Sequence, residues 1–318
     1  MKDHTIALLI PAYRAESFLP RLLQSAKTQT IPFTETRVYD DASPDGTSKV
    51  AASLGAIVTR GLENRGCSHG KNVLARETKC EWLHFHDADD ELKPDFVEKA
   101  LPWMQRSTPP DVVFFSYETR FDANGRFNDF RRFDAQALRH DPLGYVLSEQ
   151  INPFCGLYRR EPFLRAGGWD EDASILQSED QAGHLRLALA GLSFDADSAV
   201  TVVNYIREGS MTTSNLPGAN RSTFLVMKKA LLNDLGPEHR QIVARRLWKI
   251  AGFAAACKDW ETADDAGKAA AGLGPPSAQD HGLVLRTLAR FSPRLALRTR
   301  ETLIRIFKRY SRSAPVFR

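Results

Sequence analysis

Apolar runs alternate with amphipathic segments through the first third of the chain. The run Ile6–Ile10 is apolar at every position, which predicts a parallel strand buried on both faces. Further strands are expected at 37–39, 57–59 and 82–86, and helices at 17–26, 47–54, 71–78 and 94–105. Strands that alternate with helices in this order predict a parallel sheet wrapped by helices on both faces.

The pattern changes after Asp111. Apolar strands are expected at 112–121 and 126–133, around Asn124-Gly125, and Asn-Gly is a strong hairpin signal. A short helix ends at Gly167-Gly168, a second helix is expected at 180–190, and a return strand at 194–205. This half is therefore expected to be mixed rather than doubly wound.

After about residue 216 the segments are helical to the end of the chain. Breaks are expected at Gly236-Pro237, Gly272–Pro276 and Pro293, and 260–273 has the alanine spacing of a packed helical hairpin. The pattern thus predicts a domain at 1–215, with halves at 1–108 and 109–215, and a helical region at 216–318.

Composition is that of a globular protein, with 318 residues, 42% hydrophobic content and a net charge of +4. The four cysteines have no C-x-x-C spacing, which argues against a zinc ribbon and a disulfide framework. No apolar run reaches the ~18 residues of a spanning helix. A cytoplasmic protein, without signal peptide or transmembrane segment, is expected.

Three carboxylates follow the strand expected at 82–86. Asp87 and Asp89 are two residues apart, so they would point to the same side if strand geometry persisted to that point. Hard oxygen ligands suit Mg²⁺ or Mn²⁺, and substrate phosphates commonly complete the shell of such a cation. A cap for the helix after Pro94 is the alternative, and it is the role expected for Asp90.

Polar loops follow all four strands of the predicted parallel sheet. Ligands of open parallel sheets bind outside the carboxyl ends of the strands, so these loops are expected to form one site. They are Pro11-Ala12-Tyr13, Asp40-Asp41, Glu63–Gly66 and Asp87–Asp89.

Five segments, in order and at similar separations, resemble family 2 glycosyltransferases of the GT-A fold. They are Ile10–Tyr13, Asp40–Thr47, Glu63–Gly66, Asp87–Asp90 and Gly167–Glu171, and the resemblance covers about residues 5 to 212. It implies an α/β fold with a GT-A-type doubly wound mixed sheet, followed here by the helical appendage. It also implies inverting transfer from a nucleoside-diphosphate sugar, with a UDP-sugar favoured, to a carbohydrate or lipid-linked acceptor in cell-surface polysaccharide or glycolipid synthesis.

The resemblance also implies residue roles. Asp180 would be the catalytic base, Asp41 would lie near the base of the nucleotide and Asp87 near the ribose. Asp89, with Asp87, would bind Mn²⁺ or Mg²⁺. The other donor-binding residues that it implies are Pro11, Tyr13, Asp40, Asn64, Arg65, Lys71, Ala88, Glu179 and Arg207. From the residues alone, Ser178 and Gln181 also form a plausible capping box, which would leave Asp180 a helix-terminal acid.

The sequence departs from the family pattern at three places. Ala42 stands where the family usually has Gly, and Lys71-Asn72 replaces an Arg-Asn pair. The segment 205–212 resembles the family's closing loop but lacks its usual His, so either Arg207 or Glu208 would substitute for it or the binding of metal and diphosphate would be weaker. Arg207 could pair with phosphate, and a surface salt bridge is the alternative.

Basic residues gather near the end of the chain. Arg286, Arg290, Arg294 and Arg298 recur every four residues, and between Val284 and the end only Glu301 opposes the basic residues. A solvated helix face is the default interpretation, and peripheral contact with an anionic membrane surface is the sharper one. Nucleic acid is not expected as a partner, because no recognised fold or aromatic platform accompanies these residues.

Two rival functions stay open at this point. His84 and His86 lie on one strand face beside Asp87, which is compatible with a metal-dependent hydrolase. A nucleotide-sugar-binding protein without turnover is the non-enzymatic rival.

Overall fold

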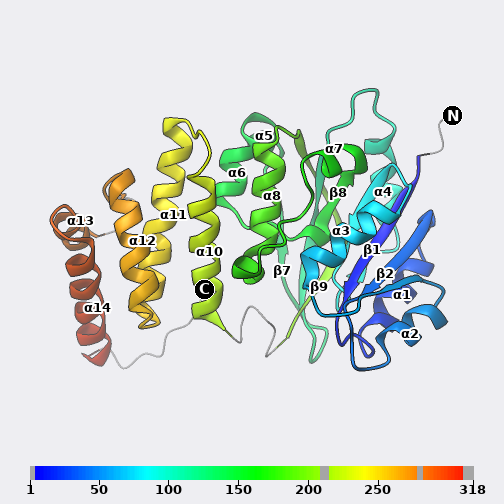
Figure 1. Cartoon of the computed structure of the whole chain (residues 1–318), viewed down its shortest axis with the longest axis horizontal. Coiled ribbons are helices and arrows are strands. Elements are labelled where there is room, and N and C mark those ends of the chain that lie inside the picture. The colour runs from blue at the N-terminus through cyan, green and yellow to red at the C-terminus, as the bar shows by residue number, and fades with distance from the viewer. Residues whose placement is uncertain (1–3, 208–214, 278–281, 311–318) are drawn as a thin grey trace. The chain divides into compact units, whose positions relative to one another are not determined.

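The computed structural model describes residues 4–207, 215–277 and 282–310. Contacts divide the chain into two compact units, Met1–Ser210 and Met211–Arg318. Figure 1 shows an α/β first unit, coloured blue to green, and a helical second unit, coloured from yellow-green to red.

The first half of the α/β unit is a parallel sheet in the order β3-β2-β1-β4. Its strands are β1 (Ile6–Ala12), β2 (Glu35–Asp40), β3 (Ile57–Arg60) and β4 (Trp82–Phe85), and its helices are α1 (Leu19–Lys27), α2 (Thr47–Ser53), α3 (Cys67–Glu77) and α4 (Phe96–Met104). All seven residues of β1 are buried, as its continuous apolar run predicts. The carboxyl ends of the four strands share one edge of the sheet.

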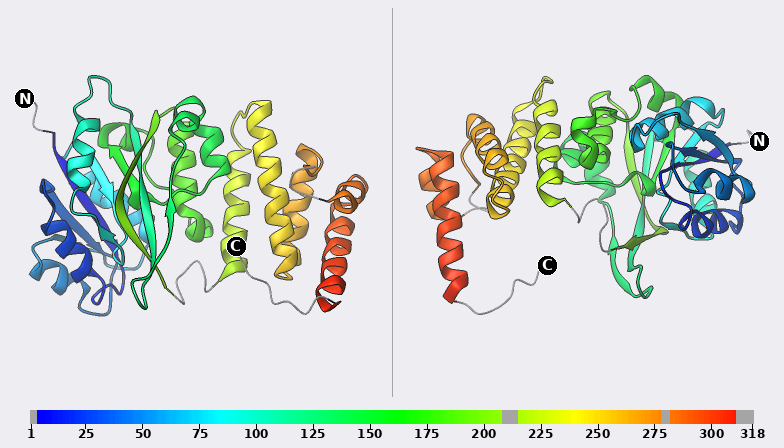
Figure 2. Two further views of the ribbon diagram at one scale, coloured as in Figure 1. Left: turned by 180° about the vertical axis from the view of Figure 1, so that it is seen from behind. Right: turned by 60° about the horizontal axis from the view of Figure 1, so that its bottom comes forward.

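The second half extends the same sheet with mixed pairing, in the order β4-β8-β6-β9-β5, and β7 pairs with β6. Its elements are β5 (Glu91–Leu92), β6 (Val112–Phe121), β7 (Phe127–Arg131), α5 (Ala135–His140), α6 (Pro142–Ser148), η1 (Pro153–Cys155), β8 (Gly156–Arg159), α7 (Arg160–Arg165), η2 (Ala173–Ser178), α8 (Glu179–Leu189) and β9 (Phe194–Ile206). The predicted hairpin is the β6–β7 pair, with Gly125 at φ 65° in its turn. Helices cover the sheet in both views of Figure 2. The predicted α/β class and mixed sheet are confirmed.

Side chains of β4 alternate between two aromatic layers. The ring of His84 lies 4.0 Å from that of Phe96 on α4, while the ring of Phe85 lies 5.2 Å from that of Phe163 on α7. Because successive strand residues point to opposite faces, α4 and α7 cover opposite faces of the sheet at β4. The carboxyl end of β4 is therefore fixed from both sides.

Two helix starts differ from those the sequence pattern predicts. The helix expected at 17–26 begins at Leu19, and its N-cap, Phe18, makes no side-chain capping bond. Helix α3 begins at Cys67, four residues before the predicted start, because Gly66 at φ 89° turns the chain into the helix. A Cβ at Gly70 would lie 2.8 Å from Tyr39 Cδ1, so glycine allows α3 to pack closely on β2.

The second unit contains the predicted helices, which lie side by side in chain order in Figures 1 and 2. They are α10 (Leu216–Ala230), α11 (Pro237–Ala256), α12 (Trp260–Leu273), α13 (Leu283–Ala289) and α14 (Pro293–Tyr310). Residues 260–273, with the alanine spacing of a packed hairpin, form the single helix α12, whose Ala263, Ala266 and Ala270 are buried where it packs on α11 and its other neighbours. Among the described residues, no helix combines the length and apolarity needed to cross a membrane.

Candidate active site

The loop after β2 is shaped by Asp40. This carboxylate is fully buried and accepts hydrogen bonds from Ser43 N at 2.8 Å, Arg60 Nη1 at 2.9 Å and the Ser48 hydroxyl. Ala42 in the same loop has φ 58°, the left-handed region that favours glycine. Both carboxylate oxygens of Asp40 are therefore engaged by the protein, and Ala42 holds a backbone conformation that glycine adopts with less strain.

Asp41 connects this loop to the loop after β3. Its Oδ1 accepts a hydrogen bond from Arg65 N at 2.9 Å, and its Oδ2 accepts one from Gly66 N at 2.8 Å. Asn64, Arg65 and Gly66 line a cavity of about 160 Å³, which Glu171 and Glu179 close from the other side. Asp41 thus braces the wall of a small polar cavity.

Pro11 and Tyr13 mark the carboxyl end of β1 within the same region. Pro11 is buried and pairs with Tyr39 of β2, whereas Tyr13 is 45% exposed beyond the end of the strand. The backbone N–H of Arg14 donates to the Ser43 hydroxyl at 3.0 Å, which joins the first loop to the second. Three of the four predicted loops are thereby connected by hydrogen bonds.

A buried lysine lies at the centre of a carboxylate cluster. The Nζ atom of Lys71 on α3 lies 3.2 Å from Glu179 Oε1 and 3.4 Å from Asp180 Oδ1, both at the start of α8. Burial alone would lower the pKa of Lys71, but Cys67 and the carboxylates of Glu179, Asp180 and Asp87 outweigh it and hold this pKa well above its usual value. Lys71 is therefore a permanent cation inside the site.

Asp180 has the electrostatic properties of a proton acceptor. Burial raises the pKa of its carboxyl to about 7, and Glu179 and Asp87 act in the same direction against the opposing effect of Lys71. The N-cap of α8, Ser178, makes no side-chain capping bond, so the capping box with Gln181, the alternative interpretation of this helix start, is not formed. A carboxyl with a pKa near neutrality can both take and release a proton at the operating pH.

Trp169 and its neighbours hold α8 against α3. Asn72 Nδ2 donates to Trp169 O at 2.9 Å, and Trp169 N donates to Asn72 Oδ1 at 2.8 Å. Gly168 has φ 67°, and a Cβ at this position would lie 2.4 Å from Asn72 Oδ1. The segment 167–171 therefore acts as a brace that keeps Asp180 beside Lys71.

The three carboxylates after β4 point to different partners. The strand ends at Phe85, so strand geometry does not persist to Asp87 and Asp89, and the condition for placing both on one side of a strand is not met. Burial raises the pKa of Asp87, Lys71 lowers it and Glu179 raises it, which associates Asp87 with the lysine cluster. Asp89 forms an ion pair with Arg207, and Ala88 between them packs on the core.

Asp90 does not cap a helix, contrary to expectation. It is buried and accepts hydrogen bonds from Asn204 Nδ2 and Tyr205 N, both at 2.8 Å. Burial, reinforced by Asp87, raises its pKa to about 8. Asp90 instead fastens the loop after β4 to β9.

Arg207, the residue directly after β9, packs against the same loop. Its guanidinium is 4.0 Å from the ring centre of Phe18, and it pairs with the Asp89 carboxylate. The closing-loop residues that follow, including Glu208, lie outside the described residues. In this structure Arg207 therefore forms a salt bridge, and its partner Asp89 is a candidate metal ligand.

Hard oxygen donors for a divalent cation are present, but few. Within residues 4–207, 215–277 and 282–310 no group of three His, Cys, Asp or Glu side chains could hold a metal ion. Asp87 and Asp89 offer two carboxylates, whose chemistry fits Mg²⁺ or Mn²⁺ if phosphates and water supply the other ligands. Arg207 would have to release Asp89 for that purpose.

His84 and His86 are packing residues. Both are fully buried, and their Nδ1 atoms lie 2.8 Å from Gly156 O and 3.0 Å from Asp87 O, respectively. Burial lowers the pKa of His86 to about 4 and that of His84 well below its usual value. Their positions among Phe33, Phe96 and Phe154 do not favour the hydrolase alternative.

Two residues of the site have no signal in the sequence. Ser68 donates to Glu179 Oε2 at 3.2 Å, across 111 positions. Arg21 on α1 donates to the backbone carbonyl of Asp89 and pairs with Asp122 at 2.8 Å. Neither lies in a recognisable motif, and both meet their partners only through the fold.

Residues 7–165 match the family model described as "Glycosyl transferase family 2". An uncharacterised glycosyltransferase of Haemophilus influenzae is 25% identical over 180 residues, which are 55% of this chain and 60% of that protein. The putative teichuronic acid biosynthesis glycosyltransferase TuaG of Bacillus subtilis is 28% identical over 104 residues, which are 31% of this chain and 41% of that protein. The aligned regions therefore span less than two thirds of each relative.

The fold is also found in solved structures. A fragment of S. aureus TarS, crystallised in complex with UDP-GlcNAc, superposes with a TM-score of 0.71 at 20% sequence identity. The similarity covers 95% of this chain and 92% of that one. At this identity the likeness establishes the GT-A-type fold and the helical region that follows it.

Proposed function

The chain belongs to glycosyltransferase family 2, and we propose that it transfers a sugar from a nucleoside diphosphate to an acceptor hydroxyl with inversion at the anomeric carbon. The observation that carries this proposal is the position of Asp180. Its near-neutral pKa, beside Lys71 and next to the cavity at the carboxyl edge of the sheet, suits a catalytic base.

In this proposal the nucleotide binds to the loops of the first half, residues 1–108. Asn64 and Arg65 line the small cavity and would contact the base, and Asp41 would hold their loop near it. Pro11, Tyr13 and Ala88 would shape the surroundings of the base. Asp40 would act through the loop that it holds. The complex of TarS with UDP-GlcNAc supports a UDP-sugar as the first donor to test.

The chemical step then needs one base. The acceptor oxygen forms a bond to the anomeric carbon, the bond from that carbon to the diphosphate breaks, and the hydroxyl proton passes to Asp180. Lys71 stays charged throughout and keeps Asp180 oriented, while Glu179 holds Lys71 from the other side. Inverting displacement of this kind requires no second carboxylic acid.

We assign Asp89 and Asp87 as the residues that would hold Mn²⁺ or Mg²⁺. When bound there, the cation would stabilise the negative charge on the departing diphosphate as a Lewis acid. Arg207 now neutralises Asp89, so on release it would be placed to pair with a phosphate.

The acceptor is proposed to be a carbohydrate or a lipid-linked saccharide at the cytoplasmic face of a membrane. TuaG, named for teichuronic acid biosynthesis, supports a role in cell-surface polysaccharide or glycolipid synthesis. The acceptor would reach Asp180 from the half at 109–215, which contributes α8 and the β6–β7 hairpin.

A thermal-shift screen tests the donor assignment. UDP, GDP and CDP are added to the full chain with and without Mn²⁺, and a ligand at 100-fold its Kd is expected to add about 2.7 kcal/mol of stability. We expect the largest shift with UDP and Mn²⁺ together. Absence of a shift with every nucleotide contradicts the donor site, and a shift without turnover of any donor favours the non-catalytic rival.

A further inference from the structure

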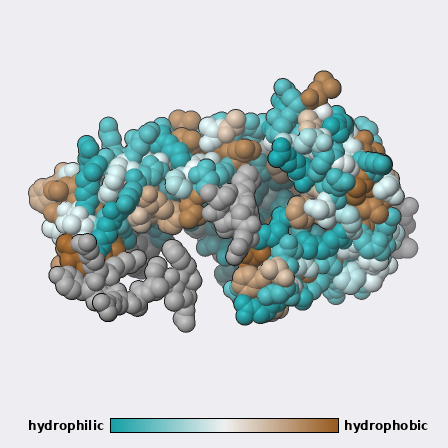
Figure 3. All heavy atoms as spheres, turned by 90° about the horizontal axis from the view of Figure 1, so that it is seen from below, coloured by the Kyte–Doolittle hydropathy of each residue, from teal (hydrophilic) through white to brown (hydrophobic). Residues whose placement is uncertain are grey.

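Helices α13 and α14, and the turn at Phe291 between them, present apolar side chains to the surface. Phe291 is 83% exposed, Leu283 73% and Leu295 52%, and Leu303 and Ile306 are also exposed. Figure 3 shows hydrophobic residues at the surface where these helices lie, among hydrophilic ones. Exposed apolar side chains that gather on neighbouring helices are typical of a contact surface.

The exposed stripe of α14 lies opposite its packed face. Leu295 and Ile306 are eleven residues apart, which is about three helical turns, so they share one side of the helix. Ala296, Leu297 and Glu301 are buried on the other side, where α14 packs on α11 and α12. The core of the unit therefore does not need the Leu295–Ile306 stripe.

Arginines flank this stripe. Arg294, Arg298 and Arg305 follow one another along an adjacent line of the helix, at spacings of four and seven residues. Arg294 and Arg298 share Asp264 of α12 at 3.1 and 3.5 Å, and their side chains stay 68% and 40% exposed. These arginines are anchored at one side and remain available to solvent.

The surface is strongly cationic. Residues 283–310 hold eight basic residues and one acidic residue, and that residue, Glu301, is 4% exposed and pairs with Arg300. Arg286 on α13 and Arg290, which follows this helix, pair with no carboxylate in the described part of the chain. A second copy of this chain would bring the same positive charge against the surface, which disfavours self-association here.

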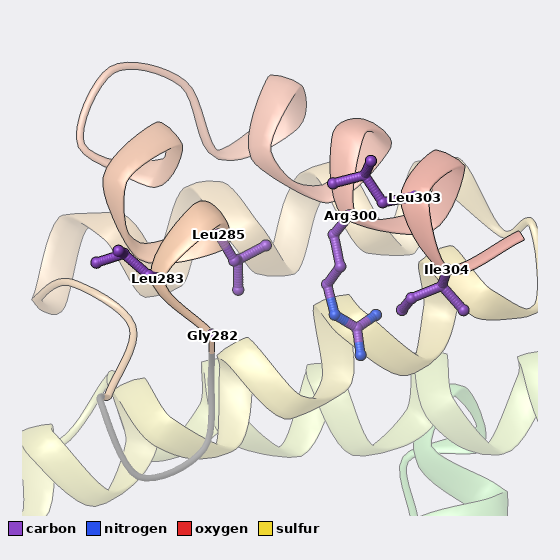
Figure 4. A pocket seen from close by; sticks show the side chains of 6 residues that line it. All are labelled: Gly282, Leu283, Leu285, Arg300, Leu303 and Ile304. Atoms are coloured by element: carbon purple, nitrogen blue, oxygen red, sulfur yellow. The ribbon is translucent and has the colours of Figure 1, made fainter. Parts of the chain in front are cut away.

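A cavity of about 300 Å³ lies between the two helices. Leu283, Leu285, Leu303 and Ile304 line it with Gly282 and Arg300, and Figure 4 shows the Arg300 side chain extending between the leucines of α13 and Ile304. An aliphatic space next to a guanidinium fits a hydrocarbon chain with a negative head group.

We propose that α13 and α14 form a peripheral docking surface for an anionic lipid bilayer. The apolar stripe Leu283, Phe291, Leu295, Leu303 and Ile306 would enter the boundary between head groups and acyl chains. The flanking arginines would reach the anionic head groups with their charged ends, because long side chains keep their apolar stems along the apolar surface. This proposal stands independently of the proposed transferase activity.

Sedimentation of the full chain with vesicles, in the absence of nucleotide and metal, tests the proposal. Vesicles of phosphatidylcholine with about 30% phosphatidylglycerol are expected to bind the chain, vesicles of phosphatidylcholine alone to bind it at least tenfold more weakly, and high salt to weaken binding. A chain that does not bind the anionic vesicles overturns the proposal.

The decisive variant is Leu295→Glu/Ile306→Glu, which places two carboxylates in the stripe. Vesicle affinity is expected to fall more than tenfold. The matched control is Leu232→Glu, because Leu232 is 87% exposed in the same unit but lies outside α13 and α14. Both proteins should keep the wild-type melting temperature and donor hydrolysis, and equal vesicle affinities for variant and control overturn the proposal.

A second variant guards against misfolding of the first. The double variant Arg286→Gln/Arg290→Gln removes two cations without touching the packed face. The loss of each charge is expected to weaken binding to anionic vesicles about fivefold. Unchanged affinity overturns the electrostatic part of the proposal.

Light scattering tests for a second copy of the chain as the occupant. If the wild type is a dimer, and Leu295→Glu/Ile306→Glu dissociates it while vesicle binding stays unchanged, a second copy is the true occupant and the lipid proposal is overturned.

Discussion

At the scale of single residues, three acids of one short loop have three different roles. Asp87 belongs to the cluster around Lys71, Asp89 pairs with Arg207, and Asp90 accepts two hydrogen bonds from β9. Glu179 and Asp180 also differ in role: Asp180 has a pKa of about 7, whereas Glu179 accepts hydrogen bonds from Ser68 and Lys71. Neighbours in sequence differ here because burial and charged partners differ.

Asp180→Asn should lower kcat by about 10²- to 10⁴-fold, because the amide cannot accept the acceptor proton. In the wild type, kcat/KM should fall as pH drops below about 7, since protonation removes the base. Initial rates of donor turnover across pH measure both effects. Glu161→Gln is the matched control, because Glu161 lies on α7 and pairs with Arg160. A turnover that survives Asp180→Asn unchanged would disprove the assignment of the base.

Arg207→Gln should strengthen the binding of Mn²⁺ in the absence of nucleotide, because Asp89 loses its competing cation. The affinity for Mn²⁺ is expected to rise about fivefold, because both members of the Arg207–Asp89 pair are partly exposed. Titration calorimetry with Mn²⁺ alone measures it, and Arg207→Lys, which keeps the charge, is the control. Equal affinities in both variants would argue against Asp89 as a metal ligand.

At the scale of elements, the site depends on how α3 and α8 are held together. Lys71 and Asn72 come from α3, Asp180 from α8, and the segment 167–171 bonds to Asn72 between them. Gly183 on α8 lies over Trp169, where a Cβ would be 1.9 Å from Trp169 Cε3. This close packing fixes the distance between the cation and the base.

Gly183→Ala should therefore destabilise the protein by about 3 kcal/mol, because the buried Trp169 ring has to shift. Urea unfolding measures the stability, and donor turnover should fall with it. Gly272→Ala on α12 serves as the control, since nothing lies within 4 Å of its Cβ position. If the two variants are equally stable, close packing of α8 on Trp169 is not what holds the site.

At the scale of the whole molecule, the residues proposed for donor binding and catalysis all come from the first unit. The unit also has its own hydrophobic core, which extends from Ile6 to Val202. The second unit carries the cationic surface of α13 and α14 instead. We therefore propose that donor chemistry and membrane docking are divided between the two units.

A fragment of residues 1–210 should bind UDP with Mn²⁺ within about threefold of the full chain, a difference of less than 1 kcal/mol. Titration calorimetry on the fragment and the full chain provides the comparison, and circular dichroism verifies that the fragment is folded. A folded fragment with at least tenfold weaker binding would mean that the second unit takes part in the donor site.

The sequence by itself determined the parallel strands, the hairpin at Asn124-Gly125, the helical region and the polar loops at one sheet edge. It could do so because continuous apolar runs, turn residues and the order of motifs are local signals. Tertiary structure alone decided that Lys71 lies between Glu179 and Asp180, that Arg207 covers Asp89, and that Asp90 fastens β9. Those contacts join residues about 110 positions apart, and their charges and pKa values arise only when folding removes them from water and places them side by side.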